Sequence, residues 1–381
     1  MSTRAQGLRK KLRLALIAAA CAVAPPATPH AQGRATHAAS ASLAQNTSAS
    51  SAQDESASAQ QVAQALARVR SASASEETFA EAFAVGTALV REGRFAEAAE
   101  VFGALAERRP RDRETLYWAA LATFNAGRPS DAAPLARRAA DIALADARSR
   151  DGTRELKSRA ADALTLLAVV LAVRGDDAGA LKSVEQAVRL APENFDAQFA
   201  LGRARFGAGD DAGAVAAFRA AVALNPRDAR ARFFLATALE RAGNTDGALA
   251  AYRELAAAQP RASEGHLGLG VLLLKRGGRE AEEGIRELQR ALEIDPNIYE
   301  ARVALGRALV ARGRADEAVE HLRRAAELAP ANPEPHYQLS LAYRRLGRGQ
   351  EAAAESAIVK RIHESRRANG ATQDTSPPPE D

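Results

Sequence analysis

Five prolines in the second half of the chain recur at an almost constant interval, and this spacing constrains the fold more than any other feature. The intervals are 34, 34, 36 and 34 residues along Pro192, Pro226, Pro260, Pro296 and Pro330. A fixed period of this length is typical of chains built from one supersecondary unit that is repeated and stacked. We therefore expect a repeat array and not a set of unrelated domains.

Within each period, small and apolar side chains recur at fixed places. Their spacing alternates between three and four residues, which predicts two helices per period. A glycine between the two halves can adopt the left-handed conformation that stops a helix, and the proline cannot continue one. Each period therefore predicts a helical hairpin and the chain an all-α fold. In the period 195–228 these places are Leu201, Gly202, Gly209, Ala214, Phe218, Ala221 and Pro226.

This pattern resembles the tetratricopeptide repeat family. The resemblance implies an α-solenoid, a right-handed superhelix of about eight tetratricopeptide helical hairpins, whose first helices line a concave groove. It covers residues 79–366. The repeats fall near 79–112, 113–146, 161–194, 195–228, 229–262, 263–298, 299–332 and 333–366.

Two repeats depart from the pattern. The second has Leu144 in place of the proline that closes the repeats on either side, so its last helix is expected to run on to about Ser149. A turn follows, and Thr153 is expected to cap a long helix that ends near Val173. The repeat 263–298 holds two additional residues near Gly277, which predicts a longer turn inside that hairpin.

The composition excludes several classes of protein. Hydrophobic residues make up 47% of the 381 residues and aromatic residues only 4%, which favours closely packed helices built from small side chains. One cysteine excludes a disulfide framework and a multi-cysteine zinc site. The net charge of +5 is carried by five basic residues among the first twenty, and the remainder has equal numbers of basic and acidic residues. Nucleic acid is therefore not expected as a partner.

Residues 1–24 have the features of a signal peptide, so we expect an exported protein, periplasmic or secreted. A basic stretch, Arg9 to Arg13, precedes an apolar run from Leu14 to Ala24 that is too short to span a bilayer. Cys21 follows Ile17 to Ala20 in an arrangement that resembles a bacterial lipoprotein signal, although Ala18 stands where that family has leucine. Cys21 is thus a candidate for lipidation, which would make the chain an outer-membrane lipoprotein. The alternative is a small apolar residue in a leader that is removed.

The segments that flank the repeats are poor in large apolar residues. Residues 25–75 are rich in Ala, Ser and Gln and are expected to form a disordered linker. Val62, Leu66 and Val69 have helical spacing, which favours a short helix within it. The tail 367–381 is also expected to be disordered.

No catalytic, cofactor-binding or metal-binding residues are predicted, and the chain is not expected to be an enzyme. The six histidines lack metal-ligand spacing, and His363-Glu364 has Arg367 where a zinc-protease motif needs a second histidine. The glycines follow no strand, so they do not form a dinucleotide-binding fingerprint. His266 and His336 occupy the fourth place of their repeats, which is a packing position between helices.

What remains is a binding surface. The resemblance implies that the groove-facing places of the first helices bind a protein or peptide partner, as a contiguous apolar surface often does. The function expected is a non-enzymatic protein–protein interaction scaffold of the bacterial cell envelope. The alternatives are a lipid-anchored assembly factor for an outer-membrane or pilus complex, and a regulatory subunit of an envelope enzyme. The candidate groove residues are Tyr117, Phe124, Phe199, Arg203, Phe206, Phe233, Leu267, Val271, Arg307 and Tyr337.

Overall fold

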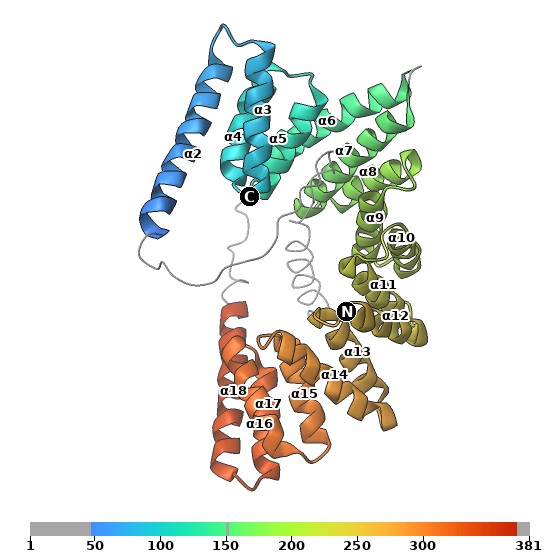
Figure 1. The fold of residues 1–381 in the computed structure, drawn as a ribbon. Helices are drawn as coiled ribbons and strands as arrows, with labels where there is room; N and C mark the ends of the chain where they lie inside the picture. The colour runs from blue at the N-terminus through green and yellow to red at the C-terminus, as the bar shows by residue number, and fades with distance from the viewer. Residues whose placement is uncertain (1–46, 150–151, 372–381) are drawn as a thin grey trace, which may run out of the picture. The chain divides into compact units, whose positions relative to one another are not determined.

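The computed structural model describes residues 47–149 and 152–371, and the regular structure within these ranges is helical, with no strand. The helices form two compact units, which meet in the sequence between Ala208 and Gly209 (Figure 1). We call them the N-terminal unit and the C-terminal unit and describe each by itself. The predicted leader 1–24 and Cys21 lie outside the described residues.

The N-terminal unit contains an additional helix followed by three helical hairpins and one further helix. Consecutive helices pack against each other. The helices are α2 (Thr47–Arg70), α3 (Glu76–Arg91), α4 (Phe95–Arg108), α5 (Arg113–Asn125), α6 (Pro129–Arg148), α7 (Arg154–Val173), α8 (Asp177–Leu190) and α9 (Phe195–Ala208).

The C-terminal unit begins with one helix and continues with four hairpins. The lengthened turn that was predicted near Gly277 is present as the short 3-10 helix η1 (Gly278–Glu280). The helices are α10 (Asp211–Leu224), α11 (Ala229–Arg241), α12 (Thr245–Ala258), α13 (Ser263–Arg276), α14 (Ala281–Ile294), α15 (Tyr299–Ala311), α16 (Ala315–Leu328), α17 (Pro333–Arg345) and α18 (Gly349–Ala371).

A left-handed glycine ends the first helix of each repeat, as the sequence predicts. At the end of α3, Gly93 has φ 76° and its N–H donates to the carbonyl of Val90. The N–H of Arg94 donates to the carbonyl of Leu89 at 2.9 Å, which satisfies another carbonyl of the last turn. The equivalent glycines with positive φ are Gly127, Gly175, Gly209, Gly243, Gly277, Gly313 and Gly347.

The repeating proline lies in a turn that also starts the next helix. After α8, the N–H of Asn194 donates to the carbonyl of Ala191 at 3.0 Å, with Pro192 at the second position of the turn, where its fixed φ is favoured. The side chain of Asn194 then accepts a hydrogen bond from the N–H of Ala197 and caps α9. One short turn therefore ends one repeat and begins the next.

In both units the first helices of successive repeats lie side by side. Helix α5 contacts α3 and α7, and α7 contacts α9; in the C-terminal unit α13 contacts α11 and α15, and α15 contacts α17. No comparable contact joins α4 to α6 or α6 to α8 within the described helices. The first helices of each unit therefore form one continuous surface.

Small residues on one helix face large side chains on the next. In the N-terminal unit the fully buried ring of Phe102 on α4 packs against Gly86 of α3. The same ring stacks on Trp118 of α5, with centroids 5.9 Å apart, and meets Phe83 edge to face at 5.3 Å. A single aromatic residue thus joins three helices, at a position where the sequence pattern requires a large side chain.

Two predictions for the flanking segments need correction. Residues 25–75 were expected to be a disordered linker with a short helix at Val62 to Val69; the helix α2 is present there, but it is longer than expected and packs on α3 and α4. The reason is its apolar face, because Val62, Ala65 and Val69 are buried. At the other end α18 extends to Ala371, into the predicted tail 367–381.

Two glycine substitutions in the first hairpin should have opposite effects on stability. A Cβ at Gly86 would lie 2.7 Å from Cζ of Phe102, whereas a Cβ at Gly103 on α4 would meet nothing within 4 Å. We expect Gly86→Ala to lower the free energy of unfolding by about 1 kcal/mol or more through overpacking. Gly103→Ala should raise it by about 0.5–1 kcal/mol, because alanine is the better helix former. Urea unfolding followed by circular dichroism measures both, and shifts in the same direction would contradict this packing.

Candidate functional site

All ten predicted groove residues lie on first helices of the repeats. The N-terminal unit carries Tyr117 and Phe124 on α5 and Phe199, Arg203 and Phe206 on α9. The C-terminal unit carries Phe233 on α11, Leu267 and Val271 on α13, Arg307 on α15 and Tyr337 on α17. These residues are candidates for binding a partner.

These residues differ sharply in exposure. Phe124, Phe199 and Phe206 are buried, with 6%, 7% and 2% of their surface exposed. The ring of Phe199 stacks on that of Phe195 one turn earlier, with centroids 6.0 Å apart. These rings fill the space between closely packed helices and offer little surface to a ligand. Sequence spacing does not distinguish such a ring from one that faces solvent.

The C-terminal unit presents the more accessible apolar surface. Tyr337 is 52% exposed, more than any other large hydrophobic residue among those described. Leu267, Val271 and Leu341 are half-buried and pack against the core of this unit, so their outer sides remain accessible. We call this the C-terminal first-helix surface: Phe233, Leu267, Val271, Leu274, Arg307, Tyr337 and Leu341.

The N-terminal unit has a small cavity between α7, α8 and α9. Its volume is about 160 Å³, which is smaller than the 300–1,000 Å³ typical of a small-molecule pocket and closer to the size of apolar side chains. The predicted residue Arg203 lies at this cavity. It is lined by Ala168, Val169, Ala172, Val173, Gly175, Asp177, Ala180, Ala200, Arg203, Ala204 and Gly207.

Two acidic residues at the same unit were missed by the sequence analysis. Asp162 of α7 and Asp196 of α9 are close enough to Tyr117 for their charges to raise the pKa of its phenol, although burial is the larger cause. Both occupy the second place of a repeat, and Tyr117 occupies the fifth place of an earlier one. These matching places within the repeats were the feature of the sequence that could have identified the two aspartates.

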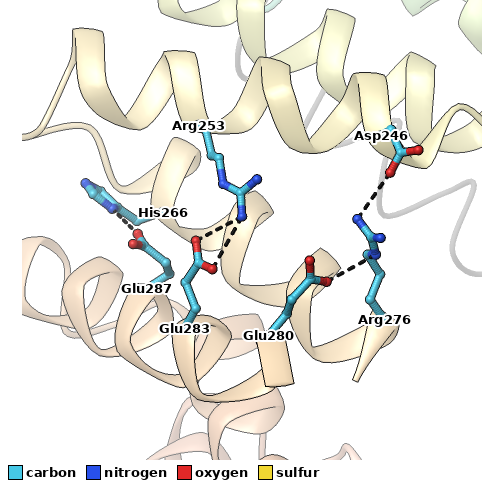
Figure 2. A network of polar contacts seen from close by, with 7 residues as sticks. All are labelled: Asp246, Arg253, His266, Arg276, Glu280, Glu283 and Glu287. Atoms are coloured by element: carbon cyan, nitrogen blue, oxygen red, sulfur yellow. Dashed lines mark hydrogen bonds and ion pairs between the residues drawn. The ribbon is translucent and has the colours of Figure 1, made fainter. Parts of the chain in front are cut away.

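Ion pairs in the C-terminal unit join helices of neighbouring repeats. Figure 2 shows Arg253 of α12 reaching Glu283 of α14, with the closer oxygen at 3.1 Å. Arg276 of α13 reaches Asp246 of α12 at 3.2 Å and Glu280 at 3.1 Å. Most of these side chains are well exposed, so each pair stabilises the fold by at most about 1 kcal/mol. The network ties helices α12, α13 and α14 together.

The histidines at the fourth place of two repeats form matching pairs. Nδ1 of His266 lies 2.7 Å from Oε2 of Glu287 (Figure 2), and Nδ1 of His336 lies 2.6 Å from Oε2 of Glu355. Each pair joins the first helix of a hairpin to the second, so these histidines are packing residues, as predicted.

In the repeat between these two pairs, an arginine takes the place of the histidine and a histidine takes the place of the glutamate. Arg302 stands 34 residues before His336, and His321 stands 34 residues before Glu355. Burial, together with the charge of Arg302, lowers the pKa of His321, while Glu320 and Glu317 act in the opposite direction. Nδ1 of His321 is buried and has no hydrogen-bond partner within the described ranges.

The described residues contain no candidate metal site. No three of their His, Cys, Asp and Glu side chains are placed to hold one metal ion. Burial raises the pKa of Tyr252 to about 12, and its hydroxyl lies 3.0 Å from that of Thr237, so it stays protonated at neutral pH. None of the helices described is both long and apolar enough to cross a membrane.

The hairpins and their continuous first-helix surfaces define a class of repeat protein that presents an extended surface to other macromolecules. Models of the tetratricopeptide repeat match 83–147, 142–195, 177–229, 199–263 and 235–297, and a further model matches 273–325. A model described as a TPR repeat matches 306–347. The chain belongs to the tetratricopeptide repeat family. Proteins of this family bind protein or peptide partners and generally act as non-catalytic scaffolds.

The solved structures that resemble this chain are distant in sequence. A tetratricopeptide repeat protein from Parabacteroides merdae is 16% identical, with a TM-score of 0.50, over 69% of this chain and 98% of that one. The Cut9–Hcn1 structure is 14% identical, with a TM-score of 0.48, over 76% of this chain and 53% of that one. YrrB, described as a TPR protein with an unusual peptide-binding site, is 19% identical, with a TM-score of 0.41, over 51% of this chain and 99% of that one. The search of curated proteins finds no match.

Stability should respond to the protonation of His321. The unfolded chain protonates this side chain near pH 6.5, whereas the folded chain does so only at lower pH, since its pKa is lowered. Stability is therefore lost as the pH falls from about 6.5 toward the lowered pKa. We expect His321→Gln to lose less free energy of unfolding than the natural chain between about pH 7.5 and about pH 5.5, measured by urea unfolding. His363→Gln, at an exposed position of α18, is the control and should behave like the natural chain. An equal loss in His321→Gln and the natural chain would contradict the assignment.

Proposed function

We propose that this protein is a non-enzymatic interaction scaffold that binds a peptide or helix of a partner on the C-terminal first-helix surface. The observation that carries the proposal is the exposure of Tyr337, 52%, beside half-buried apolar residues of the same surface. An exposed aromatic ring one helical turn from the half-buried Leu341 suits a binding contact, because tyrosine supplies a large contact area at low entropic cost.

The polar groups of this surface suit an acidic or carboxylate-bearing ligand at its edge. Arg307 of α15 is exposed and forms no ion pair within the described part of the chain. Arg344 is exposed on α17, two turns after Tyr337. A guanidinium can donate two parallel hydrogen bonds to a carboxylate, which adds directional specificity to the apolar contacts.

The rigidity of the repeats supports this mode of binding. The first helices are held by left-handed glycine ends and by contacts with neighbouring first helices. A surface that is already formed does not have to be ordered on binding, so most of the entropic cost falls on the ligand.

We further propose that the scaffold acts at the bacterial cell envelope. The support is the sequence of residues 1–24, with its basic stretch and short apolar run. A lipid anchor at Cys21, for an assembly factor of an outer-membrane or pilus complex, is the second candidate and is favoured by the residues that precede Cys21. A regulatory subunit of an envelope enzyme has no further observation in its favour.

Replacement of Tyr337 should weaken peptide binding without affecting the fold. Peptides selected from a random display library on the full chain would serve as ligands in fluorescence polarisation. We expect Tyr337→Ala to weaken at least one class of them about tenfold, since a central aromatic contact contributes this much. Arg307→Gln should weaken those that carry carboxylates at one end.

Leu224→Ala is the matched control, because Leu224 is also an exposed apolar side chain, 41%, but lies on the second helix α10. It should leave every affinity unchanged. If Tyr337→Ala changes no affinity, or if Leu224→Ala has the same effect, binding does not take place on this surface.

The export proposal has a separate test. Removal of residues 1–24 should retain the protein in the cytoplasmic fraction of its cells, whereas the full chain should leave it. Cys21→Ser should be exported like the full chain, and neither should incorporate labelled fatty acid. Labelling of the full chain that disappears in Cys21→Ser would replace this proposal with the lipid-anchored alternative.

A further inference from the structure

The cavity between α7, α8 and α9 lies where small residues replace large ones of the repeat pattern. Its lining residue Ala172 holds the twelfth place of the repeat 161–194. The repeats before and after it have Phe124 and Phe206 at that place, and both rings are buried. On α7 the alanine therefore leaves unfilled a volume that a phenyl ring takes up in the neighbouring repeats.

The wall that α9 contributes shows the same reduction. Ala200 lines the cavity and holds the sixth place of the repeat 195–228. The repeats before and after it have Leu166 and Phe234 at that place, and both side chains are buried. One large side chain is thus missing from α7 and another from α9, and both gaps open into a single cavity.

The cavity is bounded by three helices that pack on one another. Helices α7, α8 and α9 contact each other in all three pairs, so the cavity is not a gap between separated helices. Ala168 and Ala180 are buried and form its inner wall, whereas Ala172 and Gly207 are exposed at its opening. A side chain of another molecule can therefore enter where α7 and α9 end.

The size and the lining of the cavity suit a single aromatic ring. All the lining residues except Asp177 and Arg203 are alanine, valine or glycine. The volume is about 160 Å³. An apolar cavity of roughly 150 Å³ inside a protein takes up a benzene molecule. A phenyl ring is also the group that neighbouring repeats have at the twelfth place, so volume and repeat pattern indicate the same occupant.

This chain does not supply the ring from its remaining segments. Residues 1–46, 150–151 and 372–381 contain no phenylalanine, tyrosine or tryptophan. Every aromatic residue of the sequence belongs to one of the described helices, and none of them lines the cavity. A ring in this cavity would therefore come from another molecule.

We propose that this cavity binds an aromatic side chain, phenylalanine in particular, of a partner peptide. The ring is buried against Ala168 and Ala180 and replaces the two side chains that α7 and α9 lack, so that apolar surface of both molecules is removed from water. The inference rests on the proposed function in one respect, namely that a partner peptide binds along the first helices. It does not involve Tyr337 or the C-terminal first-helix surface.

The first experiment uses benzene as the probe, with methyl NMR of the full chain labelled at valine. Val169 and Val173 line the cavity, so their methyl signals should shift when benzene is added. The signals of Val101, which is fully buried on α4, should not shift. In Ala172→Phe the new ring should fill the cavity, and the shifts of Val169 and Val173 should disappear.

The second experiment uses peptides selected from a random display library on the full chain. Each phenylalanine of these peptides would be exchanged in turn for alanine. We expect one such exchange to weaken binding to the natural chain about tenfold, since a buried aromatic contact contributes this much. The same exchange should have no effect on binding to Ala172→Phe.

A second variant and a control accompany Ala172→Phe. Gly207→Val narrows the opening, and a Cβ at Gly207 would meet nothing within 4 Å, so this variant should fold and should also reduce both effects. Ala96→Phe, at an exposed position of the second helix α4, is the control and should keep both effects in full. Circular dichroism melting checks that each variant is folded.

The inference is overturned if benzene does not shift Val169 and Val173, or if the shifts persist in both filled variants. It is also overturned if no exchange of a peptide phenylalanine loses its effect in Ala172→Phe. If Tyr337→Ala weakens the peptides and no exchange is coupled to Ala172, the proposed function stands and this inference fails. If the coupling is found and Tyr337→Ala has no effect, the inference stands and the C-terminal first-helix surface is not the binding surface.

Discussion

The structure depends on how closely neighbouring helices approach each other. That distance is set by glycine residues, which have no side chain, at the points of contact. Gly306 leaves room for Leu322, and Gly268 leaves room for the ring of Tyr252, which a Cβ would meet at 2.1 Å. Gly270 and Gly284 face each other across α13 and α14, so the two backbones come close. Because protein interiors are densely packed, a large residue and the small residue opposite it act as one unit of packing. The low aromatic content follows from this, since each repeat has space for few rings.

The repeat pattern predicted most of the fold, because its signals are local. A glycine that must adopt positive φ and a proline that cannot donate a hydrogen bond act within one turn of the chain, so their effects can be read from the sequence. Thr153 caps α7, and the two additional residues near Gly277 form η1, both as predicted. Helix α2 was assigned to a linker because its apolar face is narrow and its composition is that of a flexible segment.

The candidate site was less predictable, because exposure depends on packing between elements. Phe199 and Phe233 occupy the same place of consecutive repeats, yet Phe199 is buried and Phe233 is only half-buried. The surroundings of Asp162 could not be predicted from the sequence either. Its residue type suggests a solvated helix start, and only the contacts of α5, α7 and α9 place it beside Tyr117.

The turn at η1 has a consequence for how this array can vary. It lies between the two helices of one hairpin, at the end where α13 stops and α14 begins, and it adds residues without changing the helices on either side. Gly277 and Gly278 both have positive φ there, so the backbone absorbs the added length locally. The added length is thus accommodated at a turn inside a hairpin, while the proline turn that follows α14 still leads directly into the next helix α15. Such turns are the natural places for a label or an inserted loop that leaves the stacking of repeats intact.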